Sequence, residues 1–518
     1  MVELNFDNRF VNELPGDETG ILQSRQTQGV CWSAAHPTQV AKPALLAYSK
    51  EVSHILDLSD DDVQSEAFLA AFSGNQLLPG MTPYATCYGG HQFGSWAGQL
   101  GDGRAIALGE VINKRGERWE LQLKGAGMTP YSRRADGRAV LRSSLREFLC
   151  SEAMHHLGIP TTRALSLIAT GEPVMRDMFY DGNPAMEPGA IVCRVAPSFI
   201  RFGNFEILAS RGERELLQRL IAFTIARDFP GIDMQARDYF ANWFRVICER
   251  TAKLVVEWLR VGFVHGVMNT DNMSIIGLTI DYGPYGWIDN FDPGWTPNTT
   301  DEDWRRYTLA KQPSIARWNL ERLADALETA APSRAILDEG LAHFDETLQS
   351  SLSGMLIAKF GLLQSMDEDA SLIEDAFELM QRADVDMTEF FRSLANIRQQ
   401  APKLAVLRNA FYQESLYRDH EVLFNAWLAR YAARLALQED SYEARRRRMN
   451  AVNPRFVLRN YLAQQAIDAA MQNDLSIIDR LMDAARRPYD DDIPSDLTAK
   501  RPEWAINKPG CSMLSCSS

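Results

Sequence analysis

The sequence predicts an α+β fold that ends in an extended, largely helical C-terminal region. Residues 105–112 and 119–124 are predicted to form paired strands, because apolar and polar side chains alternate in the second segment after a polar turn. Residues 240–258 carry aromatic and aliphatic side chains at helical spacing, and this pattern stops at Gly262. Beyond about Asp301 the apolar positions again follow the helical period, and no repeat of fixed length stands out.

The composition is that of an ordinary globular protein. The chain has 518 residues, 46% hydrophobic and 24% charged, which allows two or three domain-sized cores. Its 54 Lys and Arg against 68 Asp and Glu give a formal net charge of −14, so a nucleic-acid partner is not expected. No apolar run reaches the roughly 18 residues that span a bilayer, and the first residues show no signal or transit pattern. We therefore expect a cytoplasmic protein without a membrane partner.

The first part of the chain, up to about residue 75, is turn-rich, with a helix expected between Pro43 and Leu58. A glycine-rich stretch follows from Tyr88 to Arg104 and leads into the first predicted strand. Glycine lets the backbone adopt positive φ and approach a ligand closely, so such a turn at a strand is typical of a site for nucleotide phosphates. A plain loop is the alternative, because glycine spacing alone is a weak signal. The glycines are Gly89, Gly90, Gly94, Gly98, Gly101 and Gly103.

Lys124 ends the second predicted strand, which is the position of the phosphate-binding lysine in protein kinases. Glu147 follows in a predicted helix that stops at Gly158, and it is the natural ion-pair partner of this lysine. Ser144 and Glu147 also match a capping box, in which the glutamate would only close the start of the helix. The spacing leaves both interpretations open.

Arginines are expected to add positive charge near Lys124. The segment 132–138 is a basic loop with one acidic residue, Asp136. Arg194 lies on a predicted strand, 190–195, and Arg201 follows it. Such arginines usually face solvent, but in a phosphate pocket their planar guanidinium groups would hold phosphoryl oxygens.

The most informative pattern is His265 to Asn272, followed by Asp281-Tyr282-Gly283. In a protein kinase the catalytic loop is H-R-D-x-x-x-x-N, where the Asp is the base and the Asn holds a metal ion that the Asp of D-F-G also binds. Here the His and Asn keep that spacing, but Val267 occupies the position of the base. The chain is therefore either an inactive kinase or the catalyst of a different transfer. Asp271 is the nearest carboxylate that could act as the base.

Asn272 and Asp281 would offer two oxygen ligands, which suit Mg²⁺ or Mn²⁺ and not zinc. Taken singly, His265-Gly266 could be a helix-ending turn and the segment 281–283 an ordinary strand exit, because Asp and Gly are common in turns. The context favours a metal site. A long amphipathic helix precedes the first segment, and an apolar stretch, 273–280, predicted as a strand, precedes the second.

Seven scattered cysteines do not indicate a disulfide framework, and five of them are most simply core residues. Cys511 and Cys516 lie in a short tail containing Gly and Ser that little else is expected to order. A redox-responsive role for these two thiols is one hypothesis, and an inert tail is the other.

Taken together, these segments resemble the selenoprotein O family of pseudokinases, and the match covers nearly the whole chain. It is far more specific than any single motif, and it extends to the cysteine-containing tail. The matching segments are Tyr88–Gly94, Gly98–Arg104, Leu123–Gly127, Ala135–Arg138, His265–Met273 and Asp281–Pro284.

The resemblance implies a two-lobed, protein-kinase-like fold that binds ATP in a flipped orientation and transfers AMP, not phosphate, to protein hydroxyls. The flip would place the α-phosphate at a Ser, Thr or Tyr acceptor with pyrophosphate as the leaving group, which would explain the missing base. The expected parts are an N-terminal region with a nucleotide-binding lobe (1–205), a second lobe with the catalytic and metal loops (206–310), and a helical extension with the tail (311–518).

Carried over by position, the resemblance assigns roles to individual residues. Asp271 would be the base, Asn272 and Asp281 would hold the metal, and Glu147 would position Lys124. The residues that would contact ATP are Gly101, Gly103, Arg104, Lys124, Asp136, Gly137, Arg194, Arg201 and Asp281.

Two other functions remain possible from the sequence, and the sequence differs from some relatives in one segment. An ordinary phosphotransferase could use Asp271 in place of the lost base, and a non-catalytic scaffold could bind the nucleotide only. Retention of both metal ligands argues against the scaffold. The segment from Gly283 to about Asp303 lacks the cysteine of some relatives, which puts a redox bridge between it and the tail in doubt. Cys511 and Cys516 could still pair with each other or with another thiol.

Overall fold

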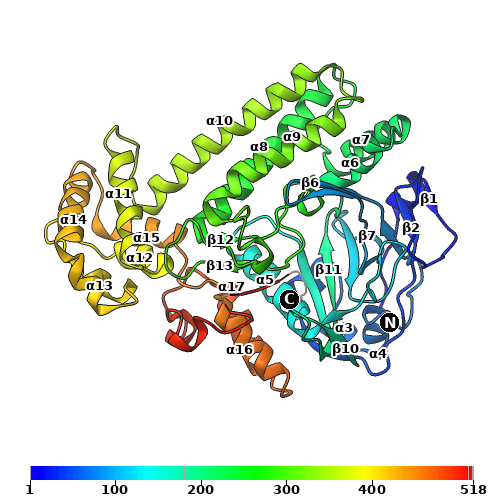
Figure 1. Cartoon of the computed structure of the whole chain (residues 1–518), viewed down its shortest axis with the longest axis horizontal. Helices are drawn as coiled ribbons and strands as arrows, with labels where there is room; N and C mark the ends of the chain where they lie inside the picture. The colour runs from blue at the N-terminus through cyan, green and yellow to red at the C-terminus, as the bar shows by residue number, and fades with distance from the viewer. Residues whose placement is uncertain (1, 179–180, 512, 516–518) are drawn as a thin grey trace.

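The computed structural model describes residues 2–178, 181–511 and 513–515, and it confirms an α+β fold (Figure 1). In the described chain the main sheet has nine strands, in the order β1-β2-β4-β7-β8-β11-β10-β3, with β9 beside β11. All its strand pairs are antiparallel except β1 with β2. The strands are β1 (Gly16–Asp17), β2 (Trp32–Ala34), β3 (Ala44–Tyr48), β4 (Tyr84–Thr86), β7 (Ala105–Ile112), β8 (Arg118–Lys124), β9 (Ala139–Val140), β10 (Arg163–Arg176) and β11 (Ala185–Ala196).

Two small sheets accompany the main one. They are the hairpin of β5 (Gly89–Gln92) with β6 (Ser95–Gln99) and the pair β12 (Phe263–Val264) with β13 (Gly286–Trp287). The described helices are α1 (Arg9–Glu13), α2 (Lys50–Ile55), α3 (Asp60–Val63), α4 (Glu66–Phe72), α5 (Leu141–His156), α6 (Phe202–Ser210), α7 (Arg214–Asp228), α8 (Tyr239–Val261), α9 (Gln312–Leu327), α10 (Arg334–Lys359), α11 (Asp369–Arg382), α12 (Met387–Leu394), α13 (Glu414–Asp419), α14 (Glu421–Ala436), α15 (Tyr442–Val452), α16 (Asn460–Ala470), α17 (Ser476–Arg486) and α18 (Ser495–Thr498).

The centre of the main sheet places Lys124 as the sequence predicts. β7 and β8 form an antiparallel pair with Ala105 opposite Lys124, and β11 pairs with the other edge of β8, with Val192 opposite Lys124. The polar side chains that alternate along β8, among them Glu120 and Gln122, are buried as well. The polar face of this strand therefore meets other protein groups and not solvent.

The long predicted helix is α8, and it ends where the sequence indicates. Gly262 follows it with φ of +73° in the left-handed conformation that commonly terminates helices. An added Cβ at this position would come within 2.9 Å of Ile288, so packing also favours glycine. β12 and the segment that carries Asp271 then follow directly.

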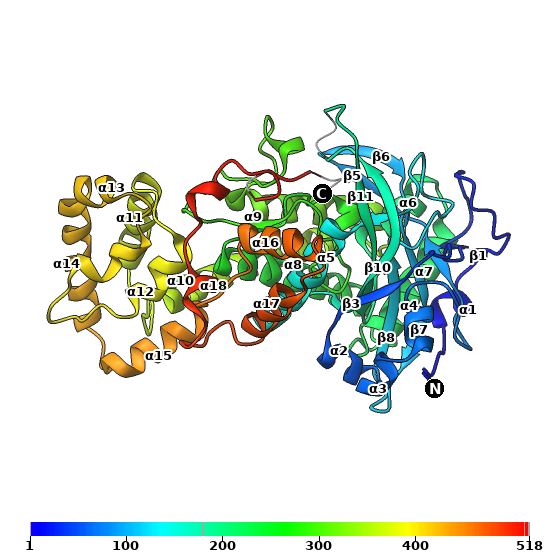
Figure 2. The ribbon, with the colours of Figure 1, turned by 90° about the horizontal axis from the view of Figure 1, so that it is seen from below.

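Two hydrophobic cores divide the molecule. One joins the main sheet to α5 and α8 and also includes side chains of α16 and α17, near the C-terminus. The other lies among α11, α12 and α14, at the far end of the chain's long axis (Figure 2). The C-terminal helices thus turn back from the second core and pack beside the first.

Two secondary-structure predictions were wrong. Ala44–Tyr48 is a strand and not part of a helix, because it pairs with β10; only Lys50–Ile55 is helical. The stretch 273–280 forms no continuous strand. It is extended, makes isolated bridges at Ser274 and Thr279, and turns at Gly277 with φ of +78°. Its apolar side chains match a strand, but no neighbouring strand supplies a continuous ladder.

No helix in the described part of the chain is long and apolar enough to cross a membrane.

Candidate active site

A cavity of about 370 Å³ lies between the main sheet and the segment 267–284. Val267, at the position of the kinase base, lines it. So do seven residues predicted from the sequence: Gly101, Gly103, Arg104, Lys124, Arg194, Asn272 and Asp281. The rest of the lining consists of Tyr88, Asp102, Ala105, Tyr131, Ser132, Arg133, Ala135, Gly283 and Pro284. The cavity therefore combines a glycine-rich wall, several cations and both predicted metal ligands.

A chain of buried ion pairs runs beside the cavity. Lys124 Nζ lies 2.5 Å from Glu147 Oε2, and Arg194 Nε lies 2.6 Å from Glu147 Oε1. Arg194 Nη2 also lies 2.8 Å from Asp281 Oδ1, and Arg201 binds Asp281 Oδ2. Arg201 Nη2 also lies 3.9 Å from Asp102 Oδ1, so three cations and three carboxylates form one network with little access to water.

The same contacts shift the pKa values of the groups involved. Burial lowers the pKa of the Lys124 ammonium to about 8, and Arg194 acts in the same direction. Burial alone would raise the pKa of Asp281, but Arg201 and Arg194 hold it well below its usual range. Asp281 is therefore a carboxylate at any physiological pH.

Glu147 is an ion-pair partner and not a helix cap. α5 begins at Leu141 with Val140 as its N-cap residue, so Ser144 and Glu147 both lie inside the helix. The Glu147 side chain is 2% exposed, and each of its oxygens contacts a cation. The capping-box interpretation is wrong because the helix starts almost a turn before Ser144.

Asn272 and Asp281 reach the cavity from two turns. Asn272 ends the 3₁₀ turn Thr270–Asn272, and its Nδ2 donates to the Val267 carbonyl at 2.9 Å, which orients the amide oxygen. Asp281 has φ of +54°, in the left-handed region that non-glycine residues seldom adopt. Two oxygen donors beside a cavity with several cations fit a hard divalent ion bound together with nucleotide phosphates. Such an ion would share Asp281 with its arginine partners.

Asp271 lies under the β5–β6 hairpin and is not among the residues that line the cavity. Gln92 Nε2 donates to its Oδ2 at 3.3 Å, while Oδ1 has no hydrogen-bond partner among the described residues. Burial raises the pKa of Asp271 to about 7, against the opposing effect of Arg201. The carboxylate is thus held by one weak bond and keeps one oxygen unused.

The β5–β6 hairpin is tied directly to the segment that carries Asp271. The His91 N–H donates to Thr270 Oγ1 at 2.7 Å, and the Phe93 N–H donates to Asn269 Oδ1 at 3.2 Å. A Cβ at Gly90 would lie 2.5 Å from Asp271 Oδ1, so any other residue there would displace the Asp271 side chain. The glycine-rich stretch therefore has two contact roles. Gly101 and Gly103 line the cavity, and Gly90 packs on Asp271.

Three residues predicted to contact ATP do not line the cavity. Asp136 binds Arg176, at 2.7 and 2.8 Å, and its side chain is 47% exposed. Gly137, with φ of +69°, packs against the Gly127 backbone. Arg201 lies one layer back, where it stacks 4.6 Å from the Tyr88 ring. Its Nε and Nη2 have no hydrogen-bond partner among the described residues.

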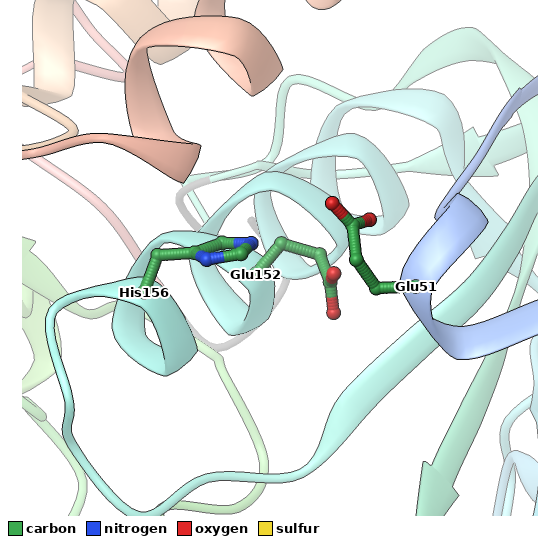
Figure 3. Close-up of side chains that lie close together, drawn as sticks. All are labelled: Glu51, Glu152 and His156. Carbon is green, nitrogen blue, oxygen red and sulfur yellow. The ribbon is translucent and has the colours of Figure 1, made fainter. Parts of the chain in front are cut away.

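A second group of possible metal ligands lies on other elements. Glu51 of α2 and Glu152 and His156 of α5 place ligand atoms within 4.8 Å of one another (Figure 3). Arg163, however, donates two 2.7 Å bonds to Glu152, and Arg486 donates one of 2.8 Å to Glu51. These arginines already balance both carboxylates, so the group is best explained as a structural junction of α2, α5 and α17.

The tail is more ordered than the sequence suggests. Leu514 forms a bridge with Asn298, and its N–H donates to the Pro297 carbonyl at 3.0 Å. Cys511 is 3% exposed, and burial raises the pKa of its thiol to about 11, so the expectation that little else orders the tail was wrong at this residue. Cys516 lies outside the described residues. A redox role for the two cysteines stays a prediction.

Known proteins match this chain over most or all of its length. A family model described as protein adenylyltransferase SelO matches residues 23–486. The protein nucleotidyltransferase YdiU of Methylobacillus flagellatus is 61% identical over 99% of this chain and the whole of the relative. The YdiU proteins of Aromatoleum aromaticum and Xanthomonas campestris are 59% and 58% identical, with both chains of each pair fully covered. The chain therefore belongs to the SelO family of protein adenylyltransferases, and it is an enzyme of the nucleotidyltransferase class.

Proposed function

We propose that this protein transfers AMP from ATP to Ser, Thr or Tyr hydroxyls of other proteins and releases pyrophosphate. The observation that carries the proposal is the buried chain of three cations and three carboxylates beside a cavity in which Val267 replaces the kinase base. We further propose a two-lobed, kinase-like arrangement, with one lobe in 1–205, a second in 206–310 and a helical extension in 311–518.

The phosphate chain of ATP is assigned to the cations. Lys124, Arg104 and Arg194 line the cavity, and Arg201 keeps two buried nitrogen donors unused, so together they can neutralise the charge that develops at the α-phosphate and the leaving pyrophosphate. Gly101 and Gly103 allow the backbone to approach the nucleotide. Asp136 and Gly137 are assigned a supporting role, in which they shape the loop that carries Ala135 into the cavity wall.

Asn272 and Asp281 would hold Mg²⁺ or Mn²⁺, which would offset the negative charge of the ATP phosphates and fix their orientation. The permanently ionised Asp281 suits this role, because a metal ligand has to be deprotonated. Glu147 does not line the cavity, and we assign it the role of orienting both Lys124 and Arg194.

Asp271 is the residue we assign as the base for the acceptor hydroxyl. Its unused Oδ1 can accept a proton, and a pKa near 7 suits proton transfer at physiological pH. Because the β5–β6 hairpin covers it, the acceptor has to approach from that side, and the hairpin has to move to admit it.

The test is incubation of the enzyme and a protein acceptor with ATP labelled at either the α- or the γ-phosphate. We expect covalent label from α-labelled ATP and none from γ-labelled ATP. Label from the γ position alone would identify a phosphotransferase in which Asp271 replaces the lost base. Label from neither, with nucleotide binding retained, would identify a non-catalytic scaffold.

A further inference from the structure

A second large hollow lies in the helical part of the molecule, away from the nucleotide cavity. It measures about 1000 Å³ and is lined by the second half of α10, by α11 and by Phe291 and Pro293. Figure 1 labels α10 and α11. It shares no lining residue with the nucleotide cavity. We call it the α10–α11 groove.

The floor of the groove is apolar. Leu352 and Leu356 of α10 face Ile373 and Phe377 of α11 across it. The Phe377 ring stacks on that of Phe291, with centroids 4.9 Å apart. Leu352, Leu356 and Phe377 are only partly buried, so the groove offers apolar area that the chain itself leaves uncovered.

The rim is acidic. Asp367, Asp369, Glu374 and Glu378 line the groove, and no Lys, Arg or His lines it in the described chain. Asp369 binds Arg434, and Glu378 binds Arg382. Asp367 and Glu374 are exposed and have no ion-pair partner among the described residues, so they favour a cationic occupant and disfavour a nucleotide.

The groove is physically continuous with the catalytic segment. Phe291 lies ten residues after Asp281 in the chain. Its N–H donates to the Val385 carbonyl at 2.8 Å, and Asn290 forms a bridge with Asp386 just beyond α11. A partner seated on Phe291 therefore touches the segment that leads back to the nucleotide cavity.

We propose that the α10–α11 groove docks protein substrates through an amphipathic helix with an apolar face and flanking Lys or Arg side chains. The proposal rests on the function proposed above. Walls made of two helices, an apolar floor and an acidic rim are the features that receive such a helix in known helix-in-groove recognition. Docking outside the cavity also lets one nucleotide site serve several acceptors, because recognition does not depend on the residues around the hydroxyl.

The test uses a designed, fluorescently labelled peptide with Leu at helical i, i+3, i+4 and i+7 positions and Lys at both ends, and a second peptide with Glu in place of each Lys. Fluorescence anisotropy with the full chain should show the Lys peptide binding about tenfold more tightly than the Glu peptide, an effect that shrinks with added salt. Equal binding of the two peptides would overturn the proposal.

Charge-reversal variants locate the binding. The double variant Asp367→Lys, Glu374→Lys should weaken binding of the Lys peptide about fivefold or more. The matched control, Glu421→Lys with Glu439→Lys, makes the same charge change at two exposed positions, the first residue of α14 and a residue just after its end, and should leave binding unchanged. Equal weakening by both pairs would show a general charge effect and overturn the assignment to the groove.

Substrate docking is tested with the Lys peptide extended by a flexible tail that contains Ser, Thr and Tyr. The groove variant should raise the KM for AMP transfer to this tail about fivefold and leave kcat unchanged, and an unchanged KM would overturn the docking role. Asp281→Ala separates the two proposals, because it should lose transfer and still bind the Lys peptide. The two measurements therefore tell a failure of the docking proposal apart from a failure of the proposed AMP transfer.

Discussion

Asp271 is buried and Asp281 is partly buried on one short segment, and the groups around their carboxyls differ. Arg201 and Arg194 bind both oxygens of Asp281, whereas the carboxylate of Asp271 forms no ion pair among the described residues and accepts a hydrogen bond from the neutral amide of Gln92. Arg201 does reach Asp271, but it donates to the backbone carbonyl, at 2.8 Å. Burial favours the neutral form of both carboxyls, and the cations decide which one stays charged.

One short segment can supply two chemical roles because different groups surround its two carboxyls. The pKa of Asp281 is held well below its usual range, while that of Asp271 is raised to about 7. A permanently charged carboxylate suits a metal and phosphate site, and one that titrates near neutrality suits proton transfer. Substitutions at and around the two residues test this division of roles.

Removal of Asp281 should have the largest effect. We expect Asp281→Ala to reduce AMP transfer by about 10³-fold or more, because it removes a metal ligand and the carboxylate that Arg194 and Arg201 share. The measurement is the initial rate with α-labelled ATP, with circular dichroism as the control for folding. Residual activity within tenfold of wild type would break the assignment.

Removal of Asp271 should lower turnover and leave nucleotide binding intact. We expect Asp271→Ala to reduce kcat by about 10²-fold, since general base catalysis typically contributes that much, with little change in the affinity for ATP. Steady-state kinetics and an ATP titration check both parts. A variant that keeps full turnover would show that Asp271 is not the base.

The ion pair behind the cavity should give an intermediate effect. Lys124→Met should reduce kcat/KM about 10- to 10²-fold, and Glu147→Gln should give a smaller loss of the same kind, because Glu147 acts only through its cations. Glu152→Gln is the matched control. It also removes a buried carboxylate from α5, but that carboxylate pairs with Arg163 and not with Lys124. It should lower the melting temperature without lowering activity per folded molecule. If Glu147→Gln behaves in the same way, its role is structural.

Gly90→Ala should have the smallest effect. Its added methyl group would lie 2.5 Å from Asp271 Oδ1, so the carboxylate must move, and we expect kcat to fall about three- to tenfold with ATP affinity unchanged. Gly231→Ala is the control, because its methyl group meets nothing within 4 Å. Equal effects of the two substitutions would remove the link between the hairpin and Asp271.

Local patterns predicted the parts of the site that depend on short stretches of chain. The β7–β8 pair, the end of α8 at Gly262 and the position of Lys124 all follow from neighbouring residues. The Lys124 partner was predicted only as one of two choices, because a capping box and an ion pair need the same glutamate. The start of α5 at Leu141 decides between them.

Contacts between distant segments could not be predicted in this way. Gln92 meets Asp271 across 179 positions, and no spacing rule relates them. Ala44–Tyr48 became a strand because β10 offers it a partner, and the tail is ordered because Leu514 pairs with Asn298. In each case the tertiary partner, and not the local sequence, determines the outcome.

The most direct test of the division of roles is an ATP titration of wild type, Asp271→Asn and Asp281→Asn, each with and without Mg²⁺ or Mn²⁺. We expect metal to strengthen ATP binding equally in wild type and Asp271→Asn, and this strengthening to be lost in Asp281→Asn. Loss of the metal effect in both variants, or its retention in both, would contradict the assignment of the metal to Asp281 and of proton transfer to Asp271.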